Sequence, residues 1–339
     1  MAWQNAPTLN KLAASQLIGK NGAQIWGVDF KGRLYTNYQM TPGGNWDGWM
    51  TNSWHQGGYP EPVYELCAAQ YSEGQATLWV LDMKRRLWII SQGKDGNWFE
   101  WTGPGWNNLP NNVQFKKMAA AWMGVKYGTR VWGIAEDGTL ISCNQIMPAT
   151  NWSPWQNWPE TPSDTTKNPP VLPARWIEVT ACSQGDGKGA LWALDTKQQL
   201  WAMFQESPGG KWGAWQGPNW KNAPKLRNIA AVDISAPSSP GSRETVLGAC
   251  IFGITDDYKI VYNNQSSPGF DDWWGWSASS FKDELRGYEI TAARQNNGSA
   301  RVWVISNRQV LVSQQVNINS SPPGWERFWT PEVAEESPQ

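Results

Sequence analysis

The sequence predicts an all-β chain that folds as one six-bladed β-propeller, with four antiparallel strands in each blade. Three sets of residues recur in phase along its 339 residues. The second strand of each repeat carries an aromatic residue, at Trp26, Trp79, Trp132, Trp192, Phe252 and Trp303. The third strand ends in glutamine, at Gln39, Gln92, Gln145, Gln205, Gln265 and Gln315. A W-x-x-W pattern, altered in the sixth repeat, then begins at Trp46, Trp98, Trp152, Trp212, Trp273 and Trp325. A period of about 55 residues, kept at all three positions, indicates one closed tandem array.

Each repeat contains four strand-length runs in the same order. A small-residue run such as LAAS (12–15) comes first, and the aromatic strand follows it. KGR (31–33) and EDG (136–138) separate the second and third strands and are typical of hairpin turns. TPGGN (41–45) and SPGGK (207–211) join the third strand to the fourth. No helical period is sustained, so helices are not expected. The repeats span about 10–62, 63–114, 115–175, 176–225, 226–287 and 288–333 of a single domain over 1–339.

The first residues of the chain predict how the ring closes. Residues 3–14, WQNAPTLNKLAA, match the linker between repeats four and five, residues 220–231, WKNAPKLRNIAA. The chain therefore begins inside an inter-repeat linker, and repeat six has no linker Trp of its own. We expect Trp3 to supply it and the ring to close through the N-terminal segment. An open solenoid, the alternative, would need polar capping repeats.

Composition excludes several classes of partner and chemistry. A net charge of −1 argues against nucleic acid or an anionic membrane surface. No apolar run is long enough to insert in a bilayer. The four cysteines have no C-x-x-C spacing, and His55 is the sole histidine, so we expect buried free thiols, no metal site and no cofactor.

The candidate binding residues are aromatic side chains and amides at repeated positions. For the linker Trp set we expect a place on the ring surface between blades, and both packing and ligand contact stay open. Its members are Trp3, Trp54, Trp106, Trp158 and Trp220, with Phe281 in the fifth repeat. The loop Trp set has the same two interpretations, and comprises Trp46, Trp98, Trp152 and Trp212. Residues three apart on a strand face opposite sides, so only one Trp of each W-x-x-W should pack inward. Gln39, Gln92, Gln145 and Gln205 either satisfy loop backbone groups or contact ligand.

These residue types suit carbohydrate. A pyranose has an apolar C–H face that an indole can cover, and hydroxyls that amides and carboxylates can bind. One sugar gives a weak site, and a ring of near-equal sites offsets this through multivalency. The sequence therefore favours a multivalent lectin whose partners are cell-surface or soluble glycans.

Two segments resemble a known repeat. LYTNYQMTPGGNWDGW (34–49) and LWAMFQESPGGKWGAW (200–215) are similar to the repeat of the Photorhabdus-type (PLL-like) β-propeller lectins. The resemblance implies binding of fucose-like or O-methylated sugars in pockets between blades, with the loop Trp set at the family's loop Trp. The best-known members have seven blades, whereas this chain has six repeats. The loop is altered to SPGFDDWW in repeat five and NSSPPGWERF in repeat six, so about four good pockets are expected.

Other functions predict different patterns. A protein-binding or toxin receptor-binding propeller would carry one asymmetric surface cluster. A glycan-active enzyme would need two placed carboxylates. The in-phase acids Asp29, Asp82 and Asp195 follow the second strand and are typical turn formers, so we predict no catalytic residues and no enzyme.

Localisation and assembly are less constrained. The first residues carry no basic and apolar signal-peptide pattern, so we expect cytoplasmic synthesis. Contact with glycans would then follow non-classical secretion, release on lysis, or defence against ingested cells. The sequence is compatible with an oligomer and does not specify one.

Overall fold

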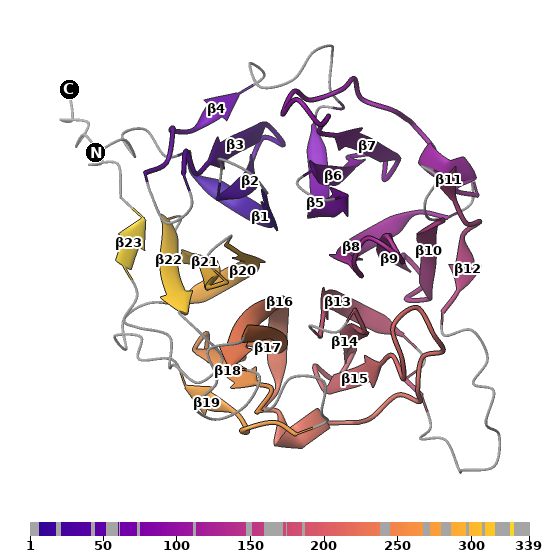
Figure 1. Cartoon of the computed structure of the whole chain (residues 1–339), viewed down its shortest axis with the longest axis vertical. Coiled ribbons are helices and arrows are strands. Elements are labelled where there is room, and N and C mark those ends of the chain that lie inside the picture. The colour runs from indigo at the N-terminus through magenta and orange to yellow at the C-terminus, as the bar shows by residue number, and fades with distance from the viewer. Residues whose placement is uncertain are drawn as a thin grey trace, which may run out of the picture.

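Six β-sheets stand around a central axis in the computed structural model of the chain (Figure 1). The structure describes residues 7–17, 22–41, 45–51, 60, 62–72, 75–110, 113–146, 151–158, 172–173, 175–184, 187–237, 245–266, 272–278, 286–295, 298–306, 309–315 and 326–328. Each sheet is one contiguous, antiparallel stretch of chain, and its first strand lies nearest the axis. The predicted all-β, six-bladed propeller is confirmed.

The blades follow one another in sequence order around the ring. Blade one contains β1 (Leu9–Gln16), β2 (Ala23–Asp29), β3 (Leu34–Tyr38) and β4 (Met50–Thr51), and blade two contains β5 (Val63–Ser72), β6 (Gln75–Asp82) and β7 (Leu87–Ser91). Blade three contains β8 (Phe115–Trp122), β9 (Thr129–Ala135), β10 (Leu140–Ile146), β11 (Asn151–Trp152) and β12 (Gln156–Asn157), and blade four contains β13 (Trp176–Ser183), β14 (Gly189–Asp195) and β15 (Leu200–Phe204). Blade five contains β16 (Leu226–Pro237), β17 (Thr245–Thr255), β18 (Ile260–Asn264) and β19 (Ser277–Ala278), and blade six contains β20 (Gly287–Arg294), β21 (Ala300–Ser306), β22 (Gln309–Gln315) and β23 (Glu326–Phe328). Two short 3-10 turns, η1 (Trp106–Asn108) and η2 (Trp220–Asn222), lie in linkers.

The fourth strand is interrupted, which differs from the four full strands that were predicted. In blade four it is reduced to two bridges, Gln205 with Trp212 and Ala202 with Gln216. Between these two bridges the third strand advances by three residues, from Ala202 to Gln205, whereas the outer segment advances by four, from Trp212 to Gln216. The outer segment therefore has one extra residue that pairs with nothing on the third strand. The same offset occurs in blades one, two, three and five. The W-x-x-W segment is therefore a β-bulge.

The bulge overturns the expectation that the two Trp residues of each W-x-x-W face opposite sides. Trp212 and Trp215 belong to the same packed cluster between blades three and four. Trp46 and Trp49 likewise share the cluster between blades six and one. The extra residue rotates the chain by one position, which returns the second indole to the side of the first.

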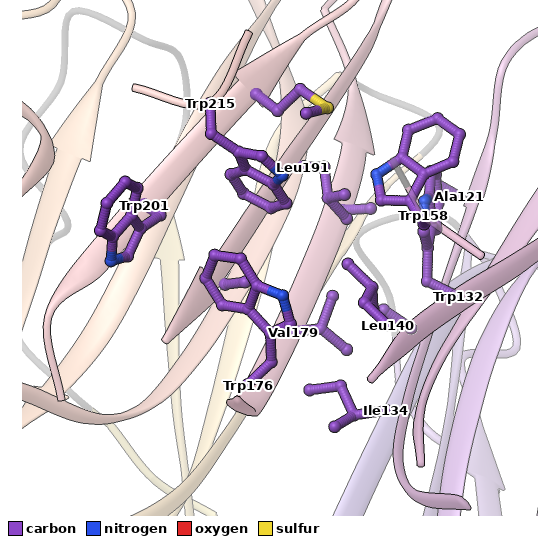
Figure 2. Packing of buried hydrophobic residues seen from close by; sticks show 14 of the residues in the cluster. Ala121, Trp132, Ile134, Leu140, Trp158, Trp176, Val179, Leu191, Trp201 and Trp215 are labelled. Carbon is purple, nitrogen blue, oxygen red and sulfur yellow. The ribbon is translucent and has the colours of Figure 1, made fainter. Parts of the chain in front are cut away.

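The hydrophobic core lies between blades. Each of six buried clusters contains one second-strand aromatic, and all six of these side chains are fully buried. The cluster between blades three and four places Trp132, Trp158, Trp176 and Trp215 around small and aliphatic side chains (Figure 2). Because each cluster draws on two neighbouring sheets, a blade cannot bury its aromatic residues alone. This dependence favours a closed ring over an open array.

Contacts between the first and last blades close the ring. Trp46 and Trp303 meet edge to face with ring centroids 5.8 Å apart. Gln295 Nε2 donates to Gln39 Oε1 at 3.1 Å, and β1 lies beside β20 (Figure 1). Trp3 falls outside the described residues, so closure through the N-terminal segment stays a prediction.

A closed ring of polar side chains surrounds the axis, and we call it the polar ring. Its members are Lys11, Glu65, Lys117, Glu178, Asn228 and Glu289, one from the start of each first strand and each just after a register shift. Lys117 Nζ lies 3.1 Å from both Glu65 and Glu178. Lys11 Nζ lies 3.3 Å from Glu65 and 3.6 Å from Glu289. Asn228 Nδ2 donates to Glu178 and Glu289, each at 3.3 Å.

All members of the polar ring except Lys11 line an axial cavity of about 450 Å³. Six alanines follow three residues further along the first strands, at Ala14, Ala68, Ala120, Ala181, Ala231 and Ala292. Beyond them, Arg294 donates to Gln16 at 3.0 Å and pairs with Asp233 at 2.8 Å. Small side chains let six first strands approach one axis, and charged groups hold the two ends in register. We therefore assign the axial cavity to the architecture of the ring.

Candidate functional site

The predicted linker and loop Trp residues come together at the blade interfaces. Three interfaces are described in full, and each joins a second-strand Trp, the linker Trp that follows it, and the first W-x-x-W residue of the next blade. The three triads are Trp79–Trp106–Trp152, Trp132–Trp158–Trp212 and Trp192–Trp220–Trp273. We call these the Trp triads.

All pairs within the Trp triads meet edge to face. The closest ring centroids are 4.8 Å apart for Trp106 with Trp152. They are 5.2 Å apart for Trp158 with Trp212, at an interplanar angle of 86°. Aromatic pairs favour this T-shaped geometry because the positive edge of one ring meets the negative face of the other. The triads are therefore rigid, repeated aromatic surfaces between blades.

Burial differs among the three positions of a triad. The second-strand Trp is inaccessible in every case, whereas the loop residues Trp152, Trp212 and Trp273 are half-buried. Of the other predicted loop residues, Trp98 is half-buried and Trp46 is buried, with 4% exposed. Among the linker residues, Trp106 is half-buried, but Trp158 and Trp220 are only 6% and 3% exposed. The expectation that the linker Trp set lies on the ring surface is therefore wrong for these two residues. The linker turns inward, and its indole fills space beside the core aromatic. Trp3, Trp54 and Phe281 lie outside the described residues.

The in-phase glutamines hold the loops that carry the loop Trp residues. Gln205 Oε1 accepts from Gly189 N at 2.9 Å, and its Nε2 donates to Gly210 O at 2.9 Å. Gln92 Nε2 donates to Gly96 O at 2.8 Å, and Gln145 Oε1 accepts from Thr129 N at 3.2 Å. Each amide, at the end of the third strand, bonds to the backbone at the start of the second strand, to the backbone of the third-to-fourth loop, or to both. Gln39, Gln92, Gln145 and Gln205 are buried, so their observed contacts are structural.

The in-phase acids stabilise turns, as predicted. Asp195 Oδ1 accepts from the backbone of Lys197 at 2.8 Å and of Gln199 at 2.9 Å. Asp29 and Asp82 accept in the same pattern two and four residues downstream. The backbone donors of Arg33 and its side chain hold the pKa of Asp29 below its usual range, against the effect of burial. These carboxylates therefore accept hydrogen bonds from the backbone of their own hairpins.

The interface between blades three and four has the richest set of side chains. The guanidinium carbon of Arg130 lies 4.7 Å from the ring centroid of Trp158, a cation–π distance. Trp158 stands beside Trp132 in the same cluster (Figure 2). Tyr127 packs against this cluster from the blade-three side, next to Gly209 of the SPGGK loop of blade four. One face therefore presents indole, phenol, guanidinium and backbone groups together.

Sequence reasoning missed Arg130 and Tyr127. Arg130 stands two residues before the second-strand Trp, and Arg301 occupies the same position in repeat six. The guanidinium of Arg301 lies 5.8 Å from the ring of Trp46, so the pairing of arginine with an interface Trp occurs twice. The arginine that recurs two residues before the second-strand Trp is the sequence feature that could have identified this pairing. Tyr127 lies in a first-to-second-strand turn of irregular length, and no periodic signal marks it.

Other chemistry has no assembled site in the described part of the chain. The four cysteines are free and buried, as predicted, and burial raises the pKa of each thiol. Among the residues that the structure describes, no group of three or more His, Cys, Asp and Glu side chains is arranged to hold a metal ion. Within the same residues, no helix has the length and apolar character needed to cross a bilayer.

Repeated aromatic interfaces in a closed ring of six sheets define a six-bladed β-propeller by architecture. No protein-family model matches this chain, and no curated protein sequence matches it. Solved structures do match. The fungal lectin of Aleuria aurantia, a six-bladed β-propeller with its own mode of fucose recognition, aligns over 97% of this chain and 100% of that chain with a TM-score of 0.65 at 13% identity.

Two further solved structures share the fold. AofleA from Arthrobotrys oligospora aligns over 94% of this chain and 85% of that chain, with a TM-score of 0.61 at 14% identity. The SapL1 lectin, solved in complex with α-methyl fucoside, aligns over 93% of this chain and 99% of that chain, with a TM-score of 0.56 at 15% identity. At these identities the likeness is one of fold. The resemblance to the Photorhabdus-type lectins in particular stays a prediction.

Proposed function

We propose that the protein is a multivalent lectin that binds fucose-like or O-methylated sugars at the blade interfaces. The observation that carries this proposal is the Trp triad, which repeats with the same geometry at three described interfaces. The half-buried loop Trp offers an indole face to the apolar C–H face of a pyranose. Fold similarity to fucose-binding propeller lectins supports the same class of ligand.

The interface between blades three and four supplies the best-equipped site. Trp212 presents the stacking surface, and Arg130 supplies N–H donors for ring hydroxyls or an O-methyl oxygen. Trp158 is too buried to stack on ligand and fixes the tilt of Trp212 instead. Gln205 positions the loop of Trp212 and does not contact sugar, because both ends of its amide are already bonded to backbone. The site residues proposed here are therefore Arg130 and Trp212.

Multivalency follows from the repeat. Equivalent loop Trp residues stand at Trp98 and Trp152, so several weak sites on one ring engage a glycan-coated surface together. The sites are not identical, because Arg130 has no counterpart beside Trp98 or Trp152. The corresponding residue, two before the second-strand Trp of the preceding blade, is Gln24 for the site of Trp98 and Thr77 for the site of Trp152. We expect a graded set of affinities.

Glycan-array screening followed by calorimetry tests the proposal. We expect hits on fucosylated or O-methylated glycans, with more than one site per chain. Trp212→Ala should weaken binding, and Trp274→Ala, at an exposed Trp of blade five, is the control. An array with no glycan hit would overturn the lectin proposal. A single tight site, untouched by Trp212→Ala, would overturn the assignment to the blade interfaces.

A protein-binding or toxin receptor-binding role is the second candidate. Trp274 is 68% exposed and Phe99 is 59% exposed, and both occupy the position directly after the first W-x-x-W residue. Exposed aromatic side chains of this size are enriched in protein interfaces. Capture of a protein that Trp274→Ala abolishes, together with a silent glycan array, would favour this role.

A further inference from the structure

The hairpin side of blade three departs from that of its two neighbours, blades two and four. In blades one, two and four, an Asp three residues after the second-strand Trp faces an aromatic residue of the third strand. The Asp oxygen lies 3.2 Å from Nε1 of Trp88 in blade two and 3.1 Å from Nε1 of Trp201 in blade four. Tyr35 makes the corresponding contact in blade one, at 3.4 Å.

In blades two and four a Gly-Pro turn of the linker covers this aromatic ring. A Cβ placed on Gly217 would lie 2.6 Å from ring atoms of Trp201, so the glycine backbone packs directly on the indole. Gly103 packs on Trp88 in the same way, at 2.7 Å. The Asp, the Trp and the Gly-Pro turn thus fill one space together.

Blade three has lost all three parts. Ala135 stands where the Asp would be, and Ile141 stands where the Trp would be. Two residues separate the second Trp of W-x-x-W from the linker Trp, against four in repeats one, two, four and five. Asn157 pairs with Ile141, as the equivalent residues pair in blades one and five, but here Trp158 follows at once, and its N donates to Leu140 O at 2.8 Å. No Gly-Pro turn remains to cover the strand.

These changes leave a cavity of about 470 Å³ on the hairpin side of blade three. This volume is within the range of about 300–1,000 Å³ that is typical of small-molecule sites. Its floor is apolar and consists of Val113, Ala135 and Ile141. Its lining contains no residue of the Trp triads, so it is separate from the interface sites.

The rim of the cavity is polar and carries two carboxylates, Glu136 and Asp137. Gln114, Thr139 and Asn157 provide hydroxyl and amide groups that both donate and accept hydrogen bonds. Glu136 pairs with Arg85 at 3.5 Å, across the linker from blade two. Asp137 Oδ1 accepts from Thr139 N at 2.8 Å, which replaces the turn contact that Ala135 cannot make.

We propose that this cavity is a second type of carbohydrate subsite, which takes one neutral pyranose ring of a glycan. An apolar floor accommodates the C–H face of the ring, and amide, hydroxyl and carboxylate groups around the edge bind its hydroxyls. Two carboxylates on the rim oppose an acidic sugar, so the subsite selects neutral rings. The proposal rests on the proposed lectin function, because it assumes that the chain meets glycans. It gives blade three a binding surface that blades two and four fill with their own side chains.

Methyl-labelled NMR separates this subsite from the Trp triads. The δ1 methyl of Ile141 reports the cavity floor, and the indole N–H groups of Trp152 and Trp212 report the neighbouring interfaces. The probes are methyl α-L-fucoside, methyl β-D-galactoside and methyl β-D-glucoside, with D-glucuronate as the acidic comparison. We expect at least one neutral glycoside to shift Ile141 saturably and glucuronate not to do so. The methyls of Ile25 and Ile254, both fully buried in blade cores, are the internal references.

Two variants test the assignment. Thr139→Ala with Asn157→Ala removes rim groups and should raise the dissociation constant seen at Ile141 by about tenfold. Ala135→Asp with Ile141→Trp restores the pair found in blade four and should lower the calorimetric number of sites by one. Indole shifts without an Ile141 shift would overturn the subsite and leave the lectin proposal standing. Ile141 shifts without indole shifts would support the subsite and overturn the interface sites. An Ile141 shift that the rim variant leaves unchanged would also overturn the subsite.

Discussion

Lys117 Nζ lies 3.1 Å from Oε2 of Glu178, although the two residues belong to different blades. Lys117 makes a second contact of the same length with Glu65 in the opposite direction. Around the polar ring the charges alternate except at Asn228, which stands between two glutamates where alternation would place a cation. Glu178 therefore has one cationic neighbour in the ring, whereas Glu65 has two.

This asymmetry predicts a pH dependence of stability. Burial, with a further contribution from Glu289, raises the pKa of Glu178 from 4.5 to about 7 despite Lys117. The folded chain thus keeps a proton that the unfolded chain loses, so this contribution to stability is fully present below pH 4.5 and is lost as pH rises through about 7. We expect the melting temperature of the wild type to fall across this window and Glu178→Gln to flatten the fall. Parallel melting profiles would show that Glu178 does not titrate there.

Glu65 provides the opposite case. Burial alone would raise its pKa, but Lys117 and Lys11 together hold it below its usual range. Its contribution to stability is present above its ordinary pKa of 4.5 and is lost as pH falls through the lower folded pKa. Glu65→Gln should therefore remove a loss of stability at acid pH, and because Glu65 also raises the pKa of Glu178, the fall assigned to Glu178 should move to lower pH.

Removing the shared cation should be costly. Lys117→Met leaves Glu65 and Glu178 buried without their common partner, and losing one member of a buried pair costs about 3–5 kcal/mol. Chemical denaturation should show this loss in the free energy of unfolding. Lys84→Met, at an exposed hairpin residue, should change it by less than about 0.5 kcal/mol. A loss below about 1 kcal/mol at Lys117 would mean that water enters the axial cavity and solvates the two carboxylates.

The sequence predicted the parts of this fold that repeat, and the parts it missed are those where a repeat is broken or bulged. The fully buried aromatic residues, such as Trp132, were predictable because each position recurs with one period. The direction of Trp215 was not, because a one-residue bulge is invisible to strand alternation. The cavity of blade three arises from a linker shorter by two residues, whose effect depends on what the other linkers cover. The polar ring recurs in phase, yet its salt bridges exist only once six blades face one axis.

The glutamine contacts predict a local loss of order. Gln205→Ala removes two hydrogen bonds and leaves Gly189 N buried without its acceptor, at a cost of about 1–3 kcal/mol. Because the amide ties the SPGGK loop to the sheet, amide hydrogen exchange in residues 206–211 should accelerate more than in β14. Gln205→Glu keeps the acceptor and loses the donor to Gly210, so its effect should be smaller. Uniform acceleration throughout blade four would instead indicate global destabilisation.

Trp212 is the first residue of W-x-x-W in blade four, and Trp274 is the second residue of the same pattern in blade five. We expect substitutions at these two positions to have separable effects. Trp212 is half-buried and contacts Trp132 and Trp158, so Trp212→Ala should destabilise the fold by about 3 kcal/mol. Trp274 is 68% exposed, and Trp274→Ala should change stability by less than about 0.5 kcal/mol. Trp212→Phe keeps an aromatic ring in the triad and should recover most of the stability. If Trp212→Phe still loses glycan binding while melting near the wild-type temperature, the indole itself contributes to recognition. If its binding is unchanged, any flat aromatic ring at position 212 serves, and Arg130 determines which sugar is held.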